Sequence, residues 1–245
     1  MSHYEQFKFV DNLYNSLQLT LQRRFLHGFT LLANYTFSKS LDTTSQNKQT
    51  AQTATDPYDL NFDRGVSDFN QPQVFSLSGL WQLPIHPSNH LAHALIGGWQ
   101  LSSIVSLHSG EPFSVYSNVD NSFSGIGSDR ADLTGNPYLA GGRSRGQQVA
   151  EWLNTAAFTE NIPGTFGDTG RNMFTGPGFA STDIALEKEF HPVERFAIQF
   201  RAEAFNAFNR PNLMNPNNNL LSPTFMVISS AFDPRILQGA IRFKW

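Results

Sequence analysis

Apolar and polar residues alternate with a period of two along about seven segments, and this alternation constrains the fold of the 245-residue chain more than any other feature. Successive side chains of a β-strand point to opposite faces, so the pattern predicts strands with one apolar face. The segment Leu17-Gln18-Leu19-Thr20-Leu21-Gln22 alternates strictly. We predict strands over residues 17–22, 29–38, 75–83, 99–108, 183–189, 196–204 and 237–245.

The connections between these strands alternate between short and very long. Very long loops follow the second, fourth and sixth strands, whereas short turns follow the first, third and fifth. Loops longer than about 15 residues are uncommon in compact soluble domains, but outer-membrane barrels combine long extracellular loops with short periplasmic turns. A strand of about ten residues tilted by about 45° rises roughly 23 Å, close to the ~25 Å apolar band of such barrels.

The sequence therefore predicts an all-β fold, namely an antiparallel up-and-down transmembrane β-barrel segment with three long extracellular loops. The alternative is a soluble β-sandwich, whose strands also alternate but are on average shorter and bury their apolar face against a second sheet.

The composition agrees with a barrel. Only 15% of the residues are charged, 13% are aromatic, and the mean hydropathy is −0.32; ordinary globular proteins contain about 25% charged residues. Uncharged polar residues suit a lumen, and apolar residues suit lipid. The aromatic content disfavours disorder, the absence of long apolar runs disfavours a spanning helix, and the net charge of −3 disfavours a nucleic-acid binder. The chain has no cysteine, hence no disulfide.

Several segments resemble the C-terminal part of TonB-dependent receptors, particularly the Oar-like subgroup. They are residues 14–25, 32–40 and 201–209, Asp63-Arg64-Gly65, Ser67-Asp68-Phe69, Gly110-Glu111-Pro112-Phe113, Gly170-Arg171-Asn172, Gly176-Pro177-Gly178-Phe179 and Ile241-Arg242-Phe243-Lys244-Trp245. The resemblance implies a 22-stranded barrel, filled by a plug, that imports scarce nutrients using energy delivered through TonB.

The chain departs from that family pattern. No plug, TonB-contacting segment or signal peptide is recognised in the sequence, and about seven strands are fewer than the smallest closed membrane barrel contains. We therefore interpret residues 1–245 as the C-terminal portion of a receptor barrel. The expected partners are outer-membrane lipid, the remaining receptor chain, the barrel assembly machinery and, only through a plug, TonB. Ile241, Phe243 and Trp245 resemble the aromatic-ended last strand by which outer-membrane proteins are recognised for assembly.

Five charged residues fall on the polar positions of the last three predicted strands and are expected to face the lumen: Asp183, Glu187, Arg201, Glu203 and Arg242. A turn centred on Pro192 would pair Asp183 with Arg201 across two strands. Such charges could contact a plug or line a permeation path, or form an ordinary solvated pair.

Two loops contain candidate ligand residues. The amides of Asn209, Asn212, Asn215 and Asn217 supply donors and acceptors that could bind a sugar or peptide, although asparagine is also common in plain loops. Asp56, Asp59, Asp63 and Asp68 are weak candidates for a Ca²⁺ site, because their spacing is not that of an EF-hand.

Catalysis is not expected. The sequence Asp168-Thr169-Gly170 matches an aspartic-protease loop but occurs once, and His86, His90 and His93 lie in a short connection without a carboxylate. We predict no enzyme activity, no cofactor and no assigned metal. The expected function is nutrient uptake (siderophore, carbohydrate or peptide) at the outer membrane; the alternative is adhesion or ligand binding at the cell surface without transport.

Overall fold

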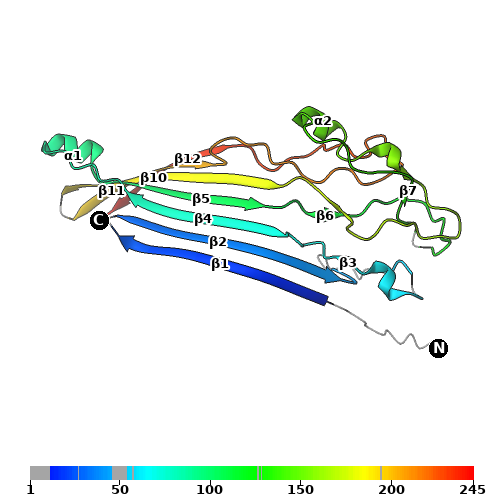
Figure 1. Cartoon of the computed structure of the whole chain (residues 1–245). Coiled ribbons are helices and arrows are strands. Elements are labelled where there is room, and N and C mark those ends of the chain that lie inside the picture. Colours follow the sequence, from blue (N-terminus) through cyan, green and yellow to red (C-terminus); the bar gives the residue numbers. More distant parts are fainter. Residues whose placement is uncertain are drawn as a thin grey trace, which may run out of the picture.

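Seven long antiparallel strands form one sheet, and their order in the sheet follows their order in the chain (Figure 1). The computed structural model describes residues 12–26, 28–45, 54–56, 58–125, 127, 129–193 and 195–245. The long strands are β1 (Asn12–Leu26), β2 (Phe29–Asp42), β4 (Gln73–Gln82), β5 (Trp99–His108), β10 (Phe179–Val193), β11 (Phe196–Phe205) and β12 (Ile236–Lys244). The predicted all-β, up-and-down arrangement is confirmed.

The register of the sheet keeps apolar residues beside apolar residues on one face. Leu19, Tyr35, Phe75 and Leu107 lie side by side across four strands. The next row of paired residues, one position along each strand, lies on the opposite face. It contains Thr20, Asn34, Ser76 and Ser106. The period-two pattern of each strand therefore adds up to one apolar face and one polar face.

The apolar face stays uncovered over much of its area. Leu17 and Leu19 are each 56% exposed and Leu21 is 64% exposed. A soluble sandwich would bury these leucines against a second sheet, whereas an open apolar face is suited to lipid. Within the described residues, no helix is long and apolar enough to cross a membrane.

Strands β1 and β12 are the two edges of the sheet. Every residue of β12 is exposed, and no pairing joins β12 to β1 within the part of the chain that the structure describes. In lipid, unpaired backbone groups of this kind cost several kcal/mol each, so both edges require partner strands.

At one end of the sheet, the β1–β2 and β10–β11 connections are short hairpins. Gly28 turns the β1–β2 hairpin with φ of +74°, a conformation that favours glycine. The short turn predicted after the third strand is wrong, because the β4–β5 connection contains helix α1 (His90–Ile96). Strand β10 continues through Pro192 to Val193, and a register irregularity between Phe190 and Val193 accommodates the proline.

The long loops at the other end fold together, in contrast to the irregular solvated loops that the sequence suggests. We call residues 109–178 and 206–235 the cap. It contains β6 (Pro112–Phe113), β7 (Asp132–Leu133), α2 (Arg145–Ala150), β8 (Phe158–Thr159), β9 (Phe174–Thr175) and a 3-10 turn, Thr155–Ala157. Strand β6 pairs with β9, and β7 with β8. The first long loop contributes another 3-10 turn, Leu60–Asp63, and the short strand β3 (Gly65–Val66), which pairs with β2.

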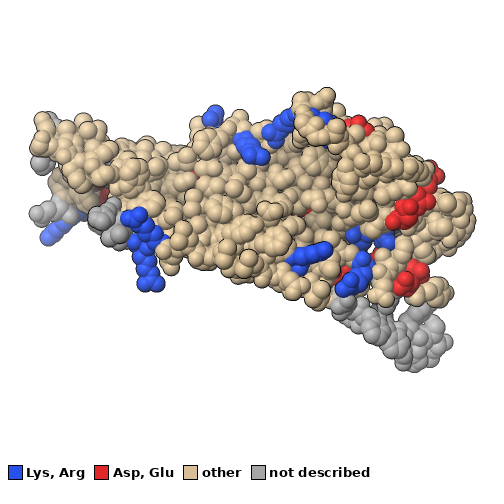
Figure 2. All heavy atoms as spheres, viewed as in Figure 1, with Lys and Arg blue, Asp and Glu red and all other residues tan. Residues whose placement is uncertain are grey.

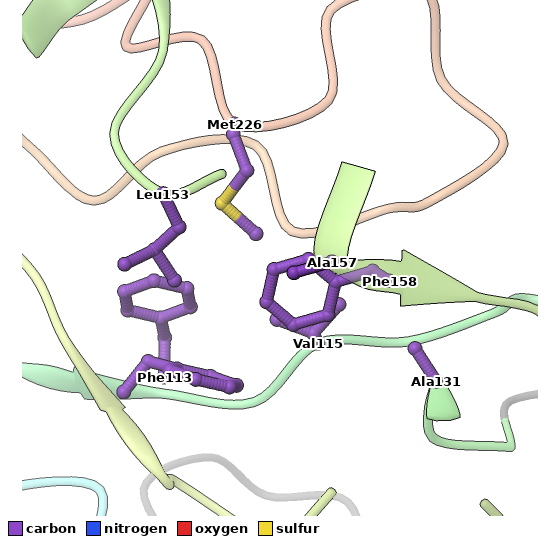
Figure 3. Close-up of a cluster of buried hydrophobic side chains, with 8 residues drawn as sticks. Phe113, Val115, Ala131, Leu153, Ala157, Phe158 and Met226 are labelled. Carbon is purple, nitrogen blue, oxygen red and sulfur yellow. The ribbon is translucent and has the colours of Figure 1, made fainter. Parts of the chain in front are cut away.

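The main cluster of buried apolar side chains lies in the cap and not against the sheet (Figure 3). Its members are Phe113, Val115, Ala131, Leu153, Ala157, Phe158, Phe174 and Met226. Phe158 packs edge-on against Phe174, with ring centroids 5.4 Å apart. Residues from both long loops meet in this cluster, so the cap is a folded unit with its own hydrophobic core.

Candidate functional site

Two arginines of the cap hold the first long loop. Arg130 is buried, and its Nη1 lies 2.9 Å from Oδ1 of Asp63. Its Nη2 donates to the carbonyl of Phe62 at 3.0 Å, and the guanidinium lies 4.0 Å from the centroid of the Phe62 ring. Arginine suits this position, because its planar group can stack and form ion pairs at once.

Arg171 forms the second contact. Its Nη2 pairs with the carboxylate of Asp42, at the end of β2, and its Nε donates to the carbonyl of Asp63 at 2.8 Å. Asp68 approaches Nη1 at 3.4 Å, and its Oδ1 accepts from Nδ2 of Asn172 at 2.6 Å. We call Arg130 and Arg171, with Asp42, Asp63 and Asp68, the arginine clamp. It joins the cap, the first long loop and the rim of the sheet.

Two glycines allow close backbone contacts beside the clamp. A Cβ on Gly65 would lie 2.4 Å from the carbonyl oxygen of Arg171, and a Cβ on Gly110 would lie 1.9 Å from that of Gly176. The Asp63-Arg64-Gly65 segment therefore docks on Gly170-Arg171-Asn172, and the segment beginning at Gly110 docks on the one beginning at Gly176. These four segments are among those that carry the family resemblance, and the structure brings them together in two pairs.

A cavity of about 290 Å³ opens where β2 meets the cap. Phe37, Ser38 and Lys39 of β2 line one side, and Asn172 and Met173 of the cap line the other. The cavity combines apolar and amide groups.

The candidate calcium carboxylates are not gathered around one point. Asp56 and Asp59 accept hydrogen bonds from nearby backbone amides, those of Tyr58 and Asn61. Asp63 accepts from Thr55 and pairs with Arg130, and Asp68 belongs to the clamp. Throughout the described ranges, no group of three or more histidine, aspartate or glutamate side chains is arranged to hold a metal ion.

The candidate ligand asparagines make contacts within the cap or between the cap and β10. Asn212 is buried and accepts from the backbone amide of Ala180 at 2.9 Å, and Asn209 accepts from that of Arg235 at 3.0 Å. Asn217 donates to the hydroxyls of Ser222 and Thr224. The side chain of Asn215 lies against Gly176. These contacts order the second long loop of the cap.

The five charged residues expected to face the lumen fall on the polar face. Glu187 lies opposite Arg201, Ala185 opposite Glu203, and Gln199 opposite Arg242. Asp183 lies opposite Ile104 of β5, beyond the ladder that β10 forms with β11.

The expected Asp183–Arg201 pair is wrong. Arg201 instead lies between Glu203, at 2.6 Å, and Glu187, at 3.7 Å. Asp183 accepts from the backbone amide of Asn206 at 2.8 Å. The β10–β11 hairpin turns after Val193 and not at Pro192, so Arg201 faces a residue four positions further along β10. An even shift leaves every side chain on its own face, which is why the polar face itself is unaffected.

The remaining candidates have local surroundings. The rings of His86 and His93 stack with centroids 6.4 Å apart, and Asp168 accepts from the backbone amide of Leu133.

In β12, Ile241 pairs with Phe200 and Phe243 with Ile198 on the apolar face, and Trp245 follows as an exposed terminal residue. In Figure 2 most of the acidic surface in view lies toward the cap end, and the surface over the sheet is largely uncharged.

Arg130 and Arg171 are not recognisable as site residues from the sequence. Both lie in polar, glycine-rich segments without periodicity, and their partners are as many as 129 positions away. The only local signal is the Gly170-Arg171-Asn172 segment itself.

A family model described as outer membrane beta barrel domain matches residues 4–238. The chain belongs to this outer membrane beta barrel family. Curated proteins and solved structures gave no match. In barrels of this kind the apolar face meets lipid, the polar face meets the lumen, long loops are extracellular and short turns are periplasmic. We therefore expect the cap to be extracellular and the α1 end to be periplasmic.

Proposed function

We propose that this chain forms part of the barrel wall, together with the extracellular cap, of a TonB-dependent receptor that takes up a nutrient of the siderophore, carbohydrate or peptide class. The observation that carries the proposal is the charged polar face of β10, β11 and β12, where Glu187, Arg201 and Glu203 form one network on the lumen side. The resemblance of the chain to Oar-like receptors supports the same proposal.

In this proposal the charged network contacts a plug inside the barrel, and TonB acts only through that plug. The open edges of β1 and β12 pair with the remaining strands of the receptor. The barrel assembly machinery recognises the last strand, which contains Ile241, Phe243 and Trp245. The chain itself performs no chemical reaction.

The test uses the complete protein in its own cells. A strain lacking the gene is grown on single iron, carbohydrate and peptide sources, with and without a protonophore that removes the energy for TonB. We expect slower growth on one source, and the protonophore should remove the difference between the two strains. Equal growth on every source would contradict uptake.

The alternative is a cell-surface adhesion or ligand-binding protein without transport. The exposed aromatic rings at the extracellular end favour it, because Tyr58 is 97% and Phe123 is 77% exposed. The gene sequence upstream separates the two functions: a plug and a TonB-contacting segment support uptake, and their absence supports adhesion.

A further inference from the structure

Helix α1 lies at the end of the sheet opposite the cap (Figure 1). It interrupts the connection between β4 and β5, at the end where the β1–β2 and β10–β11 hairpins also turn. In an outer membrane barrel this is the periplasmic boundary of the bilayer. The helix is therefore placed at the level of the lipid headgroups.

The helix is attached to the lipid side of the sheet. Lys188 lies opposite Trp99 and Phe200, in the apolar rows of β5 and β11. Its Nζ donates to the carbonyl of Ala94 and lies 4.7 Å from the centroid of the Phe190 ring. Lys188 is only 4% exposed, although it stands on the face that meets lipid.

Trp99 makes the second attachment. Its Nε1 donates to the carbonyl of Leu95 at 3.2 Å. Ala94 and Leu95 belong to the last turn of α1, where carbonyls have no partner within the helix. A lysine at the C-terminal end also interacts favourably with the helix dipole. Lys188 and Trp99 thus fix the C-terminal end of α1 to the seven-stranded sheet, which we call the wall.

The side chains that follow this attachment are apolar and uncovered. Leu95 is 67% and Ile96 is 51% exposed. They are next to the apolar rows of the wall, because their own helix is bound to Lys188 and Trp99. The apolar surface of the wall therefore continues onto α1.

We infer that α1 is an interfacial anchor, which inserts Leu95 and Ile96 into the headgroup–acyl boundary of the periplasmic leaflet while Lys188 and Trp99 hold it to the barrel. The partner is the phospholipid surface itself. Aromatic and basic side chains are suited to this depth, because their apolar parts lie among acyl chains and their polar ends reach the interface. Burial of a short apolar helix face in this zone is favourable. The inference depends on the barrel spanning the membrane and not on nutrient uptake.

The experiment places one thiol at a time in the complete protein, assembled in its outer membrane. These 245 residues contain no cysteine, and labelling of the unsubstituted protein gives the blank. A fluorophore is attached to Ile96→Cys, to Leu19→Cys in the middle of β1 and to Leu221→Cys in the cap. Leu221 is a matched control, because it is also exposed (53%) but lies at the extracellular end. Purified membranes are mixed with a water-soluble quencher, or fused with phospholipid carrying a nitroxide at the headgroup or deep in the acyl chain.

We expect the label at Ile96 to be quenched best by the headgroup nitroxide and to be several-fold less accessible to the aqueous quencher than the label at Leu221. The label at Leu19 should respond best to the deep nitroxide. Equal aqueous quenching at Ile96 and Leu221 would overturn the inference. If the protein spans the membrane but its loss does not affect growth, the uptake proposal fails. The quenching at Ile96 still tests the anchor in that case.

A second variant tests the attachment. Lys188→Met, in the Ile96→Cys protein, should raise aqueous quenching several-fold, because the C-terminal end of α1 loses a donor. Lys244→Met is the matched control, since Lys244 pairs with Glu189 on the opposite face. If the Lys188→Met protein is recovered from the outer membrane and the aqueous quenching of its label is unchanged, the role of Lys188 is refuted.

Discussion

At the scale of single residues, Arg171 joins segments that lie as many as 129 positions apart in the sequence. Its carboxylate partner Asp42 is buried, and so removal of the guanidinium leaves a charge without its partner in a region of low dielectric constant. Arg201 makes ion pairs of similar chemistry on the polar face, but its side chain is 47% exposed. The two arginines therefore differ mainly in burial.

We expect Arg171→Gln to destabilise the cap by about 3–5 kcal/mol, because the buried Asp42 loses its cation. Arg201→Gln should cost less than about 1 kcal/mol, as is usual for exposed ion pairs. Urea-dependent cleavage of the cap by a protease, on the complete protein in outer-membrane vesicles, measures both. Equal sensitivity of the two variants would show that the clamp does not hold the cap.

Gly110 provides a second test at this scale. In Gly110→Ala the new methyl group would meet the carbonyl of Gly176, so the segment must move, at a cost of about 1–3 kcal/mol. Gly141→Ala is the control, because a Cβ there meets open space. The same protease assay should separate the two variants; matching cleavage curves would argue against the close docking.

At the scale of elements, the two faces of each strand have different environments. Leu19 lies in the middle of β1 on the apolar face, and Thr20 lies beside it on the polar face. The alternation alone placed both residues correctly. It did not give the register between β10 and β11, because alternation repeats every two residues and several even offsets satisfy it. The position of the turn, after Val193 and not at Pro192, decided the offset.

Leu19→Lys should destabilise the protein in a bilayer by about 2–4 kcal/mol, because the charge faces lipid near the midplane. Thr20→Lys should cost about 0.5–1.5 kcal/mol, the value of the lost hydrogen bond to Asn34. Urea unfolding of the complete protein in phospholipid vesicles, followed by tryptophan fluorescence, compares them. A larger effect at Thr20 would mean that the faces are assigned the wrong way round.

At the scale of the whole molecule, the wall and the cap are stabilised by different interactions. The wall has an open apolar face and needs lipid, whereas the cap has its own buried cluster around Phe174. A defect in the cap core should therefore leave the wall in the membrane.

We expect Phe174→Ala to destabilise the cap by about 3–5 kcal/mol, because Phe174 is almost fully buried against Phe113 and Phe158. Phe208→Ala should have little effect, since that ring is largely exposed. Protease treatment of intact cells reports on the cap, and membrane fractionation reports on the wall. Loss of the Phe174→Ala protein from the outer-membrane fraction would show that the two parts fold as one.

The sequence by itself determined the number of long strands, their order and the apolar and polar faces, because period-two alternation is local and adds up across neighbouring strands. Only the tertiary structure decided that the long loops form a cap, that Arg130 and Arg171 clamp it, and that the asparagines order it. Those interactions join residues that are far apart in the chain and follow no period. The β10–β11 register belongs with them, since the position of the turn after Val193 selected it from several equivalent offsets.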